Sequence, residues 1–197
     1  MIILGTIWYA GGHNGDHGVD TTELWRNNQW QEHVRLPEPM WGHCMTWVNK
    51  SHILLAGGQT GNWEGSGSSY LYSEGAGFTK VENMKRPRAG HGCSGDVNEN
   101  LVFVAGGYLD QQPVKETEYF NLTSLTWSAL PELPVVAGIG TADMVGSATV
   151  GEDTIFKLED LGIASRKQWQ WVEVAKRKLV GSSFGAYIIS EKLCKLG

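Results

Sequence analysis

The chain has 197 residues, of which 41% are hydrophobic and 19% charged, a balance typical of a folded globular protein. Its formal net charge of −5 gives no basic field for nucleic acid, and no stretch approaches the roughly 20 apolar residues of a membrane span. We therefore expect neither nucleic acid nor a membrane as a partner. The nine tryptophans and 26 glycines favour many short strands joined by tight turns, and so an all-β fold.

A three-residue phrase, Ala-Gly-Gly, occurs three times, each time after an apolar run suited to a buried strand. The copies are Ala10–Gly12, Ala56–Gly58 and Ala105–Gly107. Their second glycines lie 46 and 49 residues apart. Self-similarity at a period of about 40 to 50 residues indicates stacked repeats rather than one irregular domain.

A large aromatic residue follows each phrase at nearly the same period. Trp30, Phe78 and Trp127 lie 48 and 49 residues apart, so we expect their side chains to be buried between neighbouring repeats. A fourth unit is less regular: Trp169 and Trp171 supply its late aromatics, and its glycine pair is reduced to Val150-Gly151.

These features resemble the kelch repeat, in which a di-glycine ends the second strand of a four-stranded blade and a tryptophan follows later. The resemblance covers essentially the whole chain. It implies an all-β, kelch-type β-propeller of about four four-stranded blades, either as a complete ring or as part of a larger one. Glycine suits the end of the second strand because it tolerates positive φ and the close approach of a neighbouring backbone.

We predict a single propeller domain over residues 1–197. Blade one starts at its second strand, roughly Ile2 to Ala10, and we expect its missing strand to come from the segment Ser182 to Ile189. Such closure would remove an exposed sheet edge. The alternative is that the chain is part of a longer ring. The predicted blades are about 1–35 completed by 181–190, 42–82, 90–129 and 138–174.

Because strands alternate in direction, the loops after the second and fourth strands of each blade should emerge on one face. Aromatic and arginine side chains on such loops are common anchors of protein interfaces. The candidate partner-binding residues are Trp41, Trp63, Arg86, Arg88 and Tyr108. Alternatively, Trp63 folds back onto its own loop and Arg88 buttresses the next blade.

Histidines suggest a metal site only weakly. His13, Asp16 and His17 share one glycine-rich loop but lack a further ligand, so we interpret them as solvated loop residues. His43 and His91 lie 48 residues apart, at the repeat period, which predicts a structural role such as a hydrogen bond that holds the loop between blades. We predict no metal and no cofactor.

The three cysteines, Cys44, Cys93 and Cys194, are odd in number and have no CxxC spacing. We therefore predict reduced, mostly buried thiols rather than a disulfide framework. The start of the chain does not read as a signal peptide, which favours a cytoplasmic protein, or a secreted one if a signal peptide is missing from this chain. Two triplets, Asn49-Lys50-Ser51 and Asn121-Leu122-Thr123, fit the N-glycosylation pattern.

No catalytic motif is recognisable: the chain has no GxSxG sequence, no phosphate-binding loop and no carboxylate pair whose convergence the sequence supports. The kelch resemblance implies a non-catalytic scaffold for protein–protein interaction. Such modules recognise substrates for ubiquitin-ligase adaptors or associate with actin. The alternative is a secreted, galactose-oxidase-like or carbohydrate-binding propeller. The identity of the protein partner stays open at this point.

Overall fold

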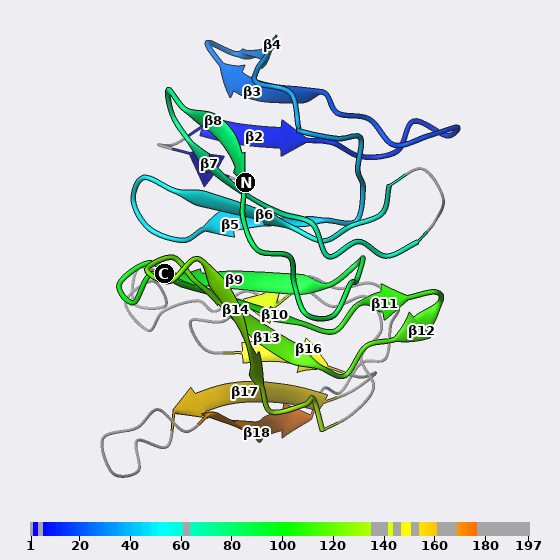
Figure 1. Ribbon diagram of the computed structural model, residues 1–197, viewed down its shortest axis with the longest axis vertical. Helices are drawn as coiled ribbons and strands as arrows, with labels where there is room; N and C mark the ends of the chain where they lie inside the picture. The colour runs from blue at the N-terminus through cyan, green and yellow to red at the C-terminus, as the bar shows by residue number, and fades with distance from the viewer. Residues whose placement is uncertain are drawn as a thin grey trace, which may run out of the picture.

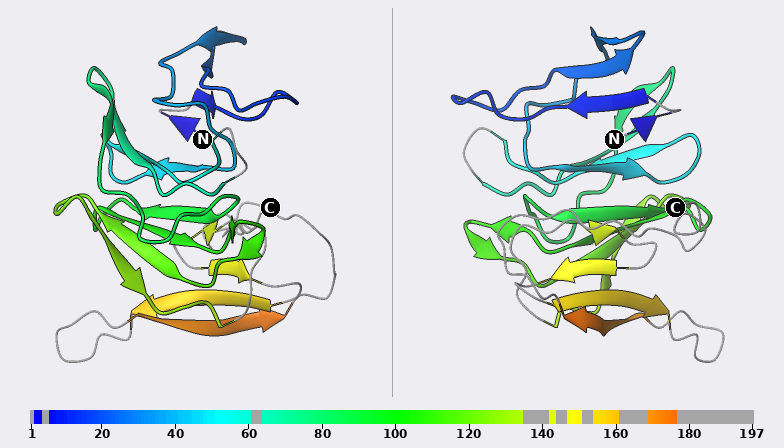
Figure 2. Two further views of the ribbon diagram at one scale, coloured as in Figure 1. Left: turned by 45° about the vertical axis from the view of Figure 1, so that its right-hand side comes forward. Right: turned by 180° about the vertical axis from the view of Figure 1, so that it is seen from behind.

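The computed structural model describes residues 2–3, 6–60, 64–134, 142–143, 147–150, 154–160 and 169–176. Every regular element in these ranges is a strand, which confirms the predicted all-β class. The described strands form four four-stranded antiparallel sheets and one small hairpin. The sheets are stacked as successive blades along the long axis of the molecule, with blade one and blade four at opposite ends (Figure 1, Figure 2).

Blade one has the strand order β1-β2-β3-β4. Its strands are β1 (Ile2–Ile3), β2 (Thr6–Ala10), β3 (Thr22–Arg26) and β4 (Gln29–Glu32). The stretch expected to be one strand is therefore split: β1 turns back on β2, and Ile2 pairs with Ile7. In this way β1 lies along the edge of β2 where the closing strand was expected. The closing segment itself, Ser182 to Ile189, lies outside the described residues.

Blade two follows the order β5-β6-β7-β8. The strands are β5 (Cys44–Trp47), β6 (Ile53–Ala56), β7 (Ser69–Ser73) and β8 (Gly77–Lys80). All four residues of β6 are buried. A strand that is apolar on both sides fits a position between two neighbouring blades, because each of its faces then packs on a core.

Blade three has the order β9-β10-β13-β14. Its strands are β9 (Gly92–Asp96), β10 (Leu101–Ala105), β13 (Thr117–Asn121) and β14 (Thr126–Leu130). The loop after its glycine pair carries a small hairpin of β11 (Tyr108–Leu109) and β12 (Gln112–Pro113).

Blade four has the order β15-β16-β17-β18. The strands are β15 (Ala142–Asp143), β16 (Ser147–Val150), β17 (Thr154–Asp160) and β18 (Trp169–Lys176). Trp169 packs edge-on against Phe103 of blade three, with ring centroids 5.1 Å apart. The late aromatic of the fourth unit therefore lies against the preceding blade.

The late aromatics of blades two and three show the same packing. Trp127 is 2% exposed and belongs to a core cluster with Leu54 of blade two, as predicted. Phe78 is partly buried beside Trp8 of blade one, at a ring-centroid distance of 6.2 Å. The prediction is wrong for Trp30, which is 45% exposed. Each aromatic faces the preceding blade, and within the described residues no blade precedes blade one.

A disulfide joins Cys44 at the start of β5 to Cys93 in β9, with Cα atoms 6.0 Å apart. The prediction of reduced thiols is therefore wrong for this pair. Their sequence separation of 49 is one repeat, so the stacking of blades brings equivalent first strands side by side. A search for short cysteine spacings cannot detect such a bond. Cys194 lies outside the described residues.

Candidate interaction face

The loops that follow the second strands and the turns within the hairpins lie on opposite sides of the stacked blades (Figure 1). We call the first side the loop face and the second the turn face. The loop face comprises the described residues of loops 11–21, 57–68 and 106–116 and of connections 33–43 and 81–91. The turn face comprises the turns at 27–28, 48–52, 74–76, 97–100 and 122–125.

The glycine pairs hold the connections between blades. The amide of Gly58 donates to the carbonyl of Arg88 at 2.8 Å, and one repeat earlier Gly12 donates to Met40 at 2.9 Å. A Cβ at Gly57 would lie only 2.7 Å from the carbonyl oxygen of Arg88. A larger residue would therefore push the connection away, which explains why the phrase is repeated.

Backbone bridges fix the loops to the same connections. Trp41 and Gln59 exchange backbone hydrogen bonds of 3.1 and 2.8 Å, and Ala89 and Tyr108 exchange bonds of 2.9 and 2.8 Å one repeat later. Trp41 and Tyr108, two of the predicted contact residues, are half-buried. The Trp41 ring also meets His13 edge-on, with centroids 4.9 Å apart. Both aromatic side chains are thus presented from a fixed backbone.

Arg86 lies on the loop face as predicted, and its Nε is 3.3 Å from Oε1 of Glu116. The two side chains are 46% and 42% exposed. Sequence reasoning did not select Glu116, which lies between the β11–β12 hairpin and β13. Trp63, the remaining aromatic candidate, lies outside the described residues, so its contact with a partner stays a prediction.

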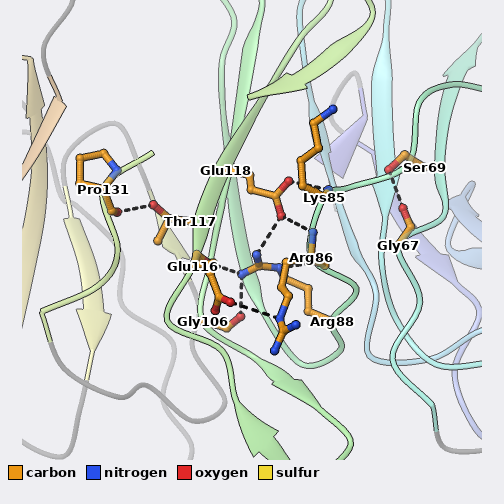
Figure 3. A network of polar contacts seen from close by, with 10 residues as sticks. All are labelled: Gly67, Ser69, Lys85, Arg86, Arg88, Gly106, Glu116, Thr117, Glu118 and Pro131. Carbon is orange, nitrogen blue, oxygen red and sulfur yellow. Dashed lines mark hydrogen bonds and ion pairs between the residues drawn. The ribbon is translucent and has the colours of Figure 1, made fainter. Parts of the chain in front are cut away.

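Arg88 is not available to a partner, because its side chain is 0% exposed. Its Nη2 lies 3.0 Å from Oε1 of Glu118, and its Nη1 donates to the carbonyls of Gly106 at 3.1 Å and Glu116 at 2.6 Å (Figure 3). The structure contradicts the interface role and supports the alternative, in which Arg88 buttresses blade three. Burial lowers the pKa of Arg88, and the Glu118 carboxylate opposes that shift.

Glu118 completes this network from β13. Its carboxylate oxygens accept the backbone amides of Lys85 at 2.7 Å and Arg86 at 2.9 Å. A buried charge is tolerated only when it is paired and hydrogen-bonded, and both conditions hold here. The Arg88–Glu118 pair therefore fixes the connection that displays Arg86. Sequence reasoning missed Glu118, whose one signal was an acidic residue directly before two aromatic residues in a strand.

His43 and His91, which we call the inter-blade histidines, pack over the first glycine of the preceding blade. A Cβ at Gly57 would lie 2.5 Å from Cε1 of His91, and one at Gly11 would lie 2.9 Å from Cε1 of His43. Burial lowers the pKa of His43 to about 4 and that of His91 to about 3. For His91 the charge of Arg88 adds to the effect of burial and the backbone of Ala56 opposes it, and neither ring nitrogen has a partner with good hydrogen-bond geometry among the described residues.

The predicted structural role of the inter-blade histidines is therefore packing rather than a hydrogen bond in the case of His91. The other histidine cluster is held by local loop contacts. Nδ1 of His13 accepts the amide of Gly15 at 3.1 Å, and the His17 ring lies 3.3 Å from the Asn14 amide nitrogen. Across the described ranges, no three His, Cys, Asp or Glu side chains are grouped so as to hold a metal ion. The described ranges also contain no helix able to cross a membrane.

Comparison with known proteins supports the resemblance found in the sequence. Residues 89–134 match the kelch motif. The chain is 28% identical over 108 residues to kelch-like protein 25 of Xenopus tropicalis, which covers 54% of this chain but 18% of that protein. A fungal alcohol oxidase of the AA5 family, solved with copper, superposes with a TM-score of 0.57 at 11% identity over 86% of this chain and 40% of that one. That likeness shows the fold alone, and the chain spans less than half of either relative.

Proposed function

Because this chain belongs to the kelch-repeat proteins, we propose that it is a non-catalytic interaction module that binds a protein partner through its loop face. The observation that supports this proposal is the fixed presentation of contact residues. Trp41 and Tyr108 emerge from paired backbone, and Arg86 emerges from a connection held by the buried Arg88–Glu118 pair.

Rigid presentation favours affinity because little conformational entropy is lost when the partner binds. The residue types also fit, since tyrosine, tryptophan and arginine dominate the contacts that carry binding energy in protein interfaces. The exposed Arg86–Glu116 pair gives the face a cation and an anion close together. A partner that supplies a carboxylate to Arg86 would compete with Glu116 and would gain little net energy from that contact alone. We therefore assign the larger share of the binding energy to the aromatic residues.

In the finer form of the proposal, the loop face is the substrate-recognition part of a ubiquitin-ligase adaptor or of an actin-associated protein. Either role requires companion domains. The match to kelch-like protein 25 covers 18% of that protein, so most of its length has no counterpart in the matched segment.

Site-specific photo-crosslinking tests the binding face even though the partner is unidentified. A photoreactive phenylalanine analogue would replace Trp41, Trp63, Arg86 or Tyr108, one position at a time, in cells that express the protein. We expect one crosslinked species of the same mass from at least two of these positions. Melting temperatures close to the parent's would show that each variant keeps its fold.

The matched controls are Val97 and Leu125, which are exposed apolar residues on the turn face. We expect no crosslink to the same partner from these two positions. If the partner crosslinks at Val97 or Leu125 and at none of the loop-face positions, the proposed binding face is wrong.

A further inference from the structure

Blades one and two enclose a cavity of about 250 Å³ that opens beside the turn face, away from the loops of the proposed interaction site. Arg26, at the end of β3, contributes from blade one, and Lys50, in the β5–β6 turn, contributes from blade two. Ligand sites for whole small molecules are typically about 300 to 1,000 Å³. This cavity therefore has the size for one side chain rather than for a large ligand.

The inner wall of the cavity is apolar. Leu24 of blade one and Ile53 of blade two are buried, and Tyr72 and Trp47 add aromatic surface from blade two. An apolar group that enters such a space is removed from water on most sides, which is the main source of affinity for a small contact.

One polar pair inside the cavity already satisfies itself. The His33 Nε2 lies 3.1 Å from the hydroxyl oxygen of Tyr72. Burial and the nearby Arg26 lower the pKa of His33, which favours the neutral form of its ring. A ligand therefore needs no charged group to bind beside this pair, and the wall that the pair forms can contact an apolar side chain.

The charged residues of the lining are exposed: Arg26 and Lys50 are cationic and Glu74 is anionic. The four ion pairs among the described residues involve neither Arg26 nor Lys50. The lining thus carries a net positive charge on a chain whose formal net charge is −5. Two cations outside any of these ion pairs, beside an apolar cavity, complement a group that is apolar at its tip and anionic beside it.

We propose that this cavity is a second binding site, which takes an apolar side chain from an acidic peptide segment of a protein partner. The apolar side chain enters between the two blades, and the neighbouring carboxylates contact Arg26 and Lys50. This site lies away from the loop face and does not depend on the function proposed for that face.

Three short peptides separate the two parts of this proposal. The first is acetyl-Glu-Phe-Glu-amide, the second replaces both glutamates with glutamine, and the third replaces phenylalanine with alanine. Binding would be measured by amide chemical-shift changes in NMR titrations of the full chain. We expect the first peptide to bind most tightly, with saturable shifts at Trp47, Ile53 and Tyr72. The glutamine peptide should bind about threefold to tenfold more weakly, since two exposed charge contacts are lost.

A charge-matched pair of variants tests the cations. Arg26→Gln combined with Lys50→Gln should reduce the affinity for the acidic peptide to that for the glutamine peptide. The control, Arg35→Gln combined with Lys80→Gln, removes the same charge from exposed residues that do not line the cavity and should leave the affinity unchanged. All four positions are exposed, so both variants should stay folded.

The proposal is wrong if no saturable shift occurs in the cavity at the highest soluble peptide concentration. Equal binding of all three peptides would also overturn it, as would an equal loss of affinity in the control variant, which would indicate a general charge effect. If the chemical-shift changes were confined to the loop face, the acidic peptide would bind there and not in the cavity, and the proposal would be wrong.

Discussion

The buried pair of Arg88 and Glu118 allows a sharp test of how the loop face is held. Replacement of Arg88 by Met keeps much of the side-chain volume but leaves the Glu118 carboxylate buried without its cation. It also removes donors from the carbonyls of Gly106 and Glu116. Removal of one partner of a buried ion pair costs about 3 to 5 kcal/mol. We therefore expect Arg88→Met to lower the free energy of unfolding by that amount.

Glu118→Gln should cost less than Arg88→Met, since the side-chain oxygen of glutamine can still accept one of the two amides, of Lys85 and Arg86, that the two carboxylate oxygens accept. The double variant should cost less than the sum of the two single variants, because neither charge is then left alone in the interior. The coupling energy for groups in direct contact is about 0.5 to 3 kcal/mol. Guanidinium denaturation followed by tryptophan fluorescence would measure all four unfolding free energies. In the same variants, hydrogen exchange should become faster at the amides of Lys85 and Arg86.

The control is Arg35→Met, which breaks the exposed ion pair between Arg35 and Asp20, at 2.7 Å and with 66% of the arginine side chain accessible. A surface pair contributes about 0 to 1 kcal/mol, so this variant should stay close to the parent. If Arg88→Met also cost less than about 1 kcal/mol, or if its cost and that of Glu118→Gln simply added, the pair would not hold the connection as we argue.

Three further predictions concern contacts between blades. Reduction of the disulfide between Cys44 and Cys93, which closes a segment with a sequence separation of 49, should lower the free energy of unfolding by up to about 4 kcal/mol, measured in melts with and without dithiothreitol. Trp127→Ala should lower the free energy of unfolding by about 3 to 5 kcal/mol, whereas Trp30→Ala, at the exposed equivalent position, should lower it by less than about 1 kcal/mol. Equal losses in denaturant titrations would refute the packing of late aromatics on preceding blades. The inter-blade histidines have folded pKa values of about 4 and about 3, below their unfolded value, so their stabilising effect is complete above about pH 6.5 and falls with acidification. Protonation of each histidine should lower the free energy of unfolding by about 2 to 3 kcal/mol at pH 4.5. If the free energy of unfolding of the parent changed as little between pH 7 and 4.5 as that of a variant with both histidines replaced by leucine, the prediction would be contradicted.

The repeat made the fold predictable, because one physical requirement recurs at each of its landmarks. The paired glycine gives the connection room to cross the strand end, as Gly57 does beneath Arg88. The late aromatic covers the preceding blade, as Trp127 does. Trp30 has the sequence position of a late aromatic, but within the described residues no blade precedes its own. Its side chain is therefore exposed rather than buried.

Residues outside the repeat were harder to place, because their roles depend on what one blade presents to another. Arg88 looks like a surface residue in the sequence, since charged residues are rarely buried without a partner. Its partner, Glu118, is 30 residues away and becomes a neighbour only after β13 folds back beside the connection. The cysteine pair follows the same logic, because Cys44 and Cys93 meet only when two blades stack.

The two N-glycosylation triplets illustrate how a local pattern can have a structural cause. Oδ1 of Asn49 accepts the amides of Ser51 and His52 at 2.9 and 2.8 Å, and Oδ1 of Asn121 accepts the amide of Thr123 at 2.8 Å. Asparagine side chains that accept backbone amides two residues ahead stabilise turns. Tight hairpin turns alone therefore account for asparagine at both positions.

The turn face and the loop face therefore differ in which of their groups stabilise the fold. On the turn face, side chains such as Asn49 accept the backbone hydrogen bonds that close the hairpin turns. The binding site that we propose on this side therefore lies between two blades, where Arg26 and Lys50 flank an apolar cavity. On the loop face, the glycine pairs and the Arg88–Glu118 pair hold the backbone, which leaves the loop side chains free to vary. A repeat sequence therefore identifies the scaffold, while specificity for a partner depends on residues that the repeat does not constrain.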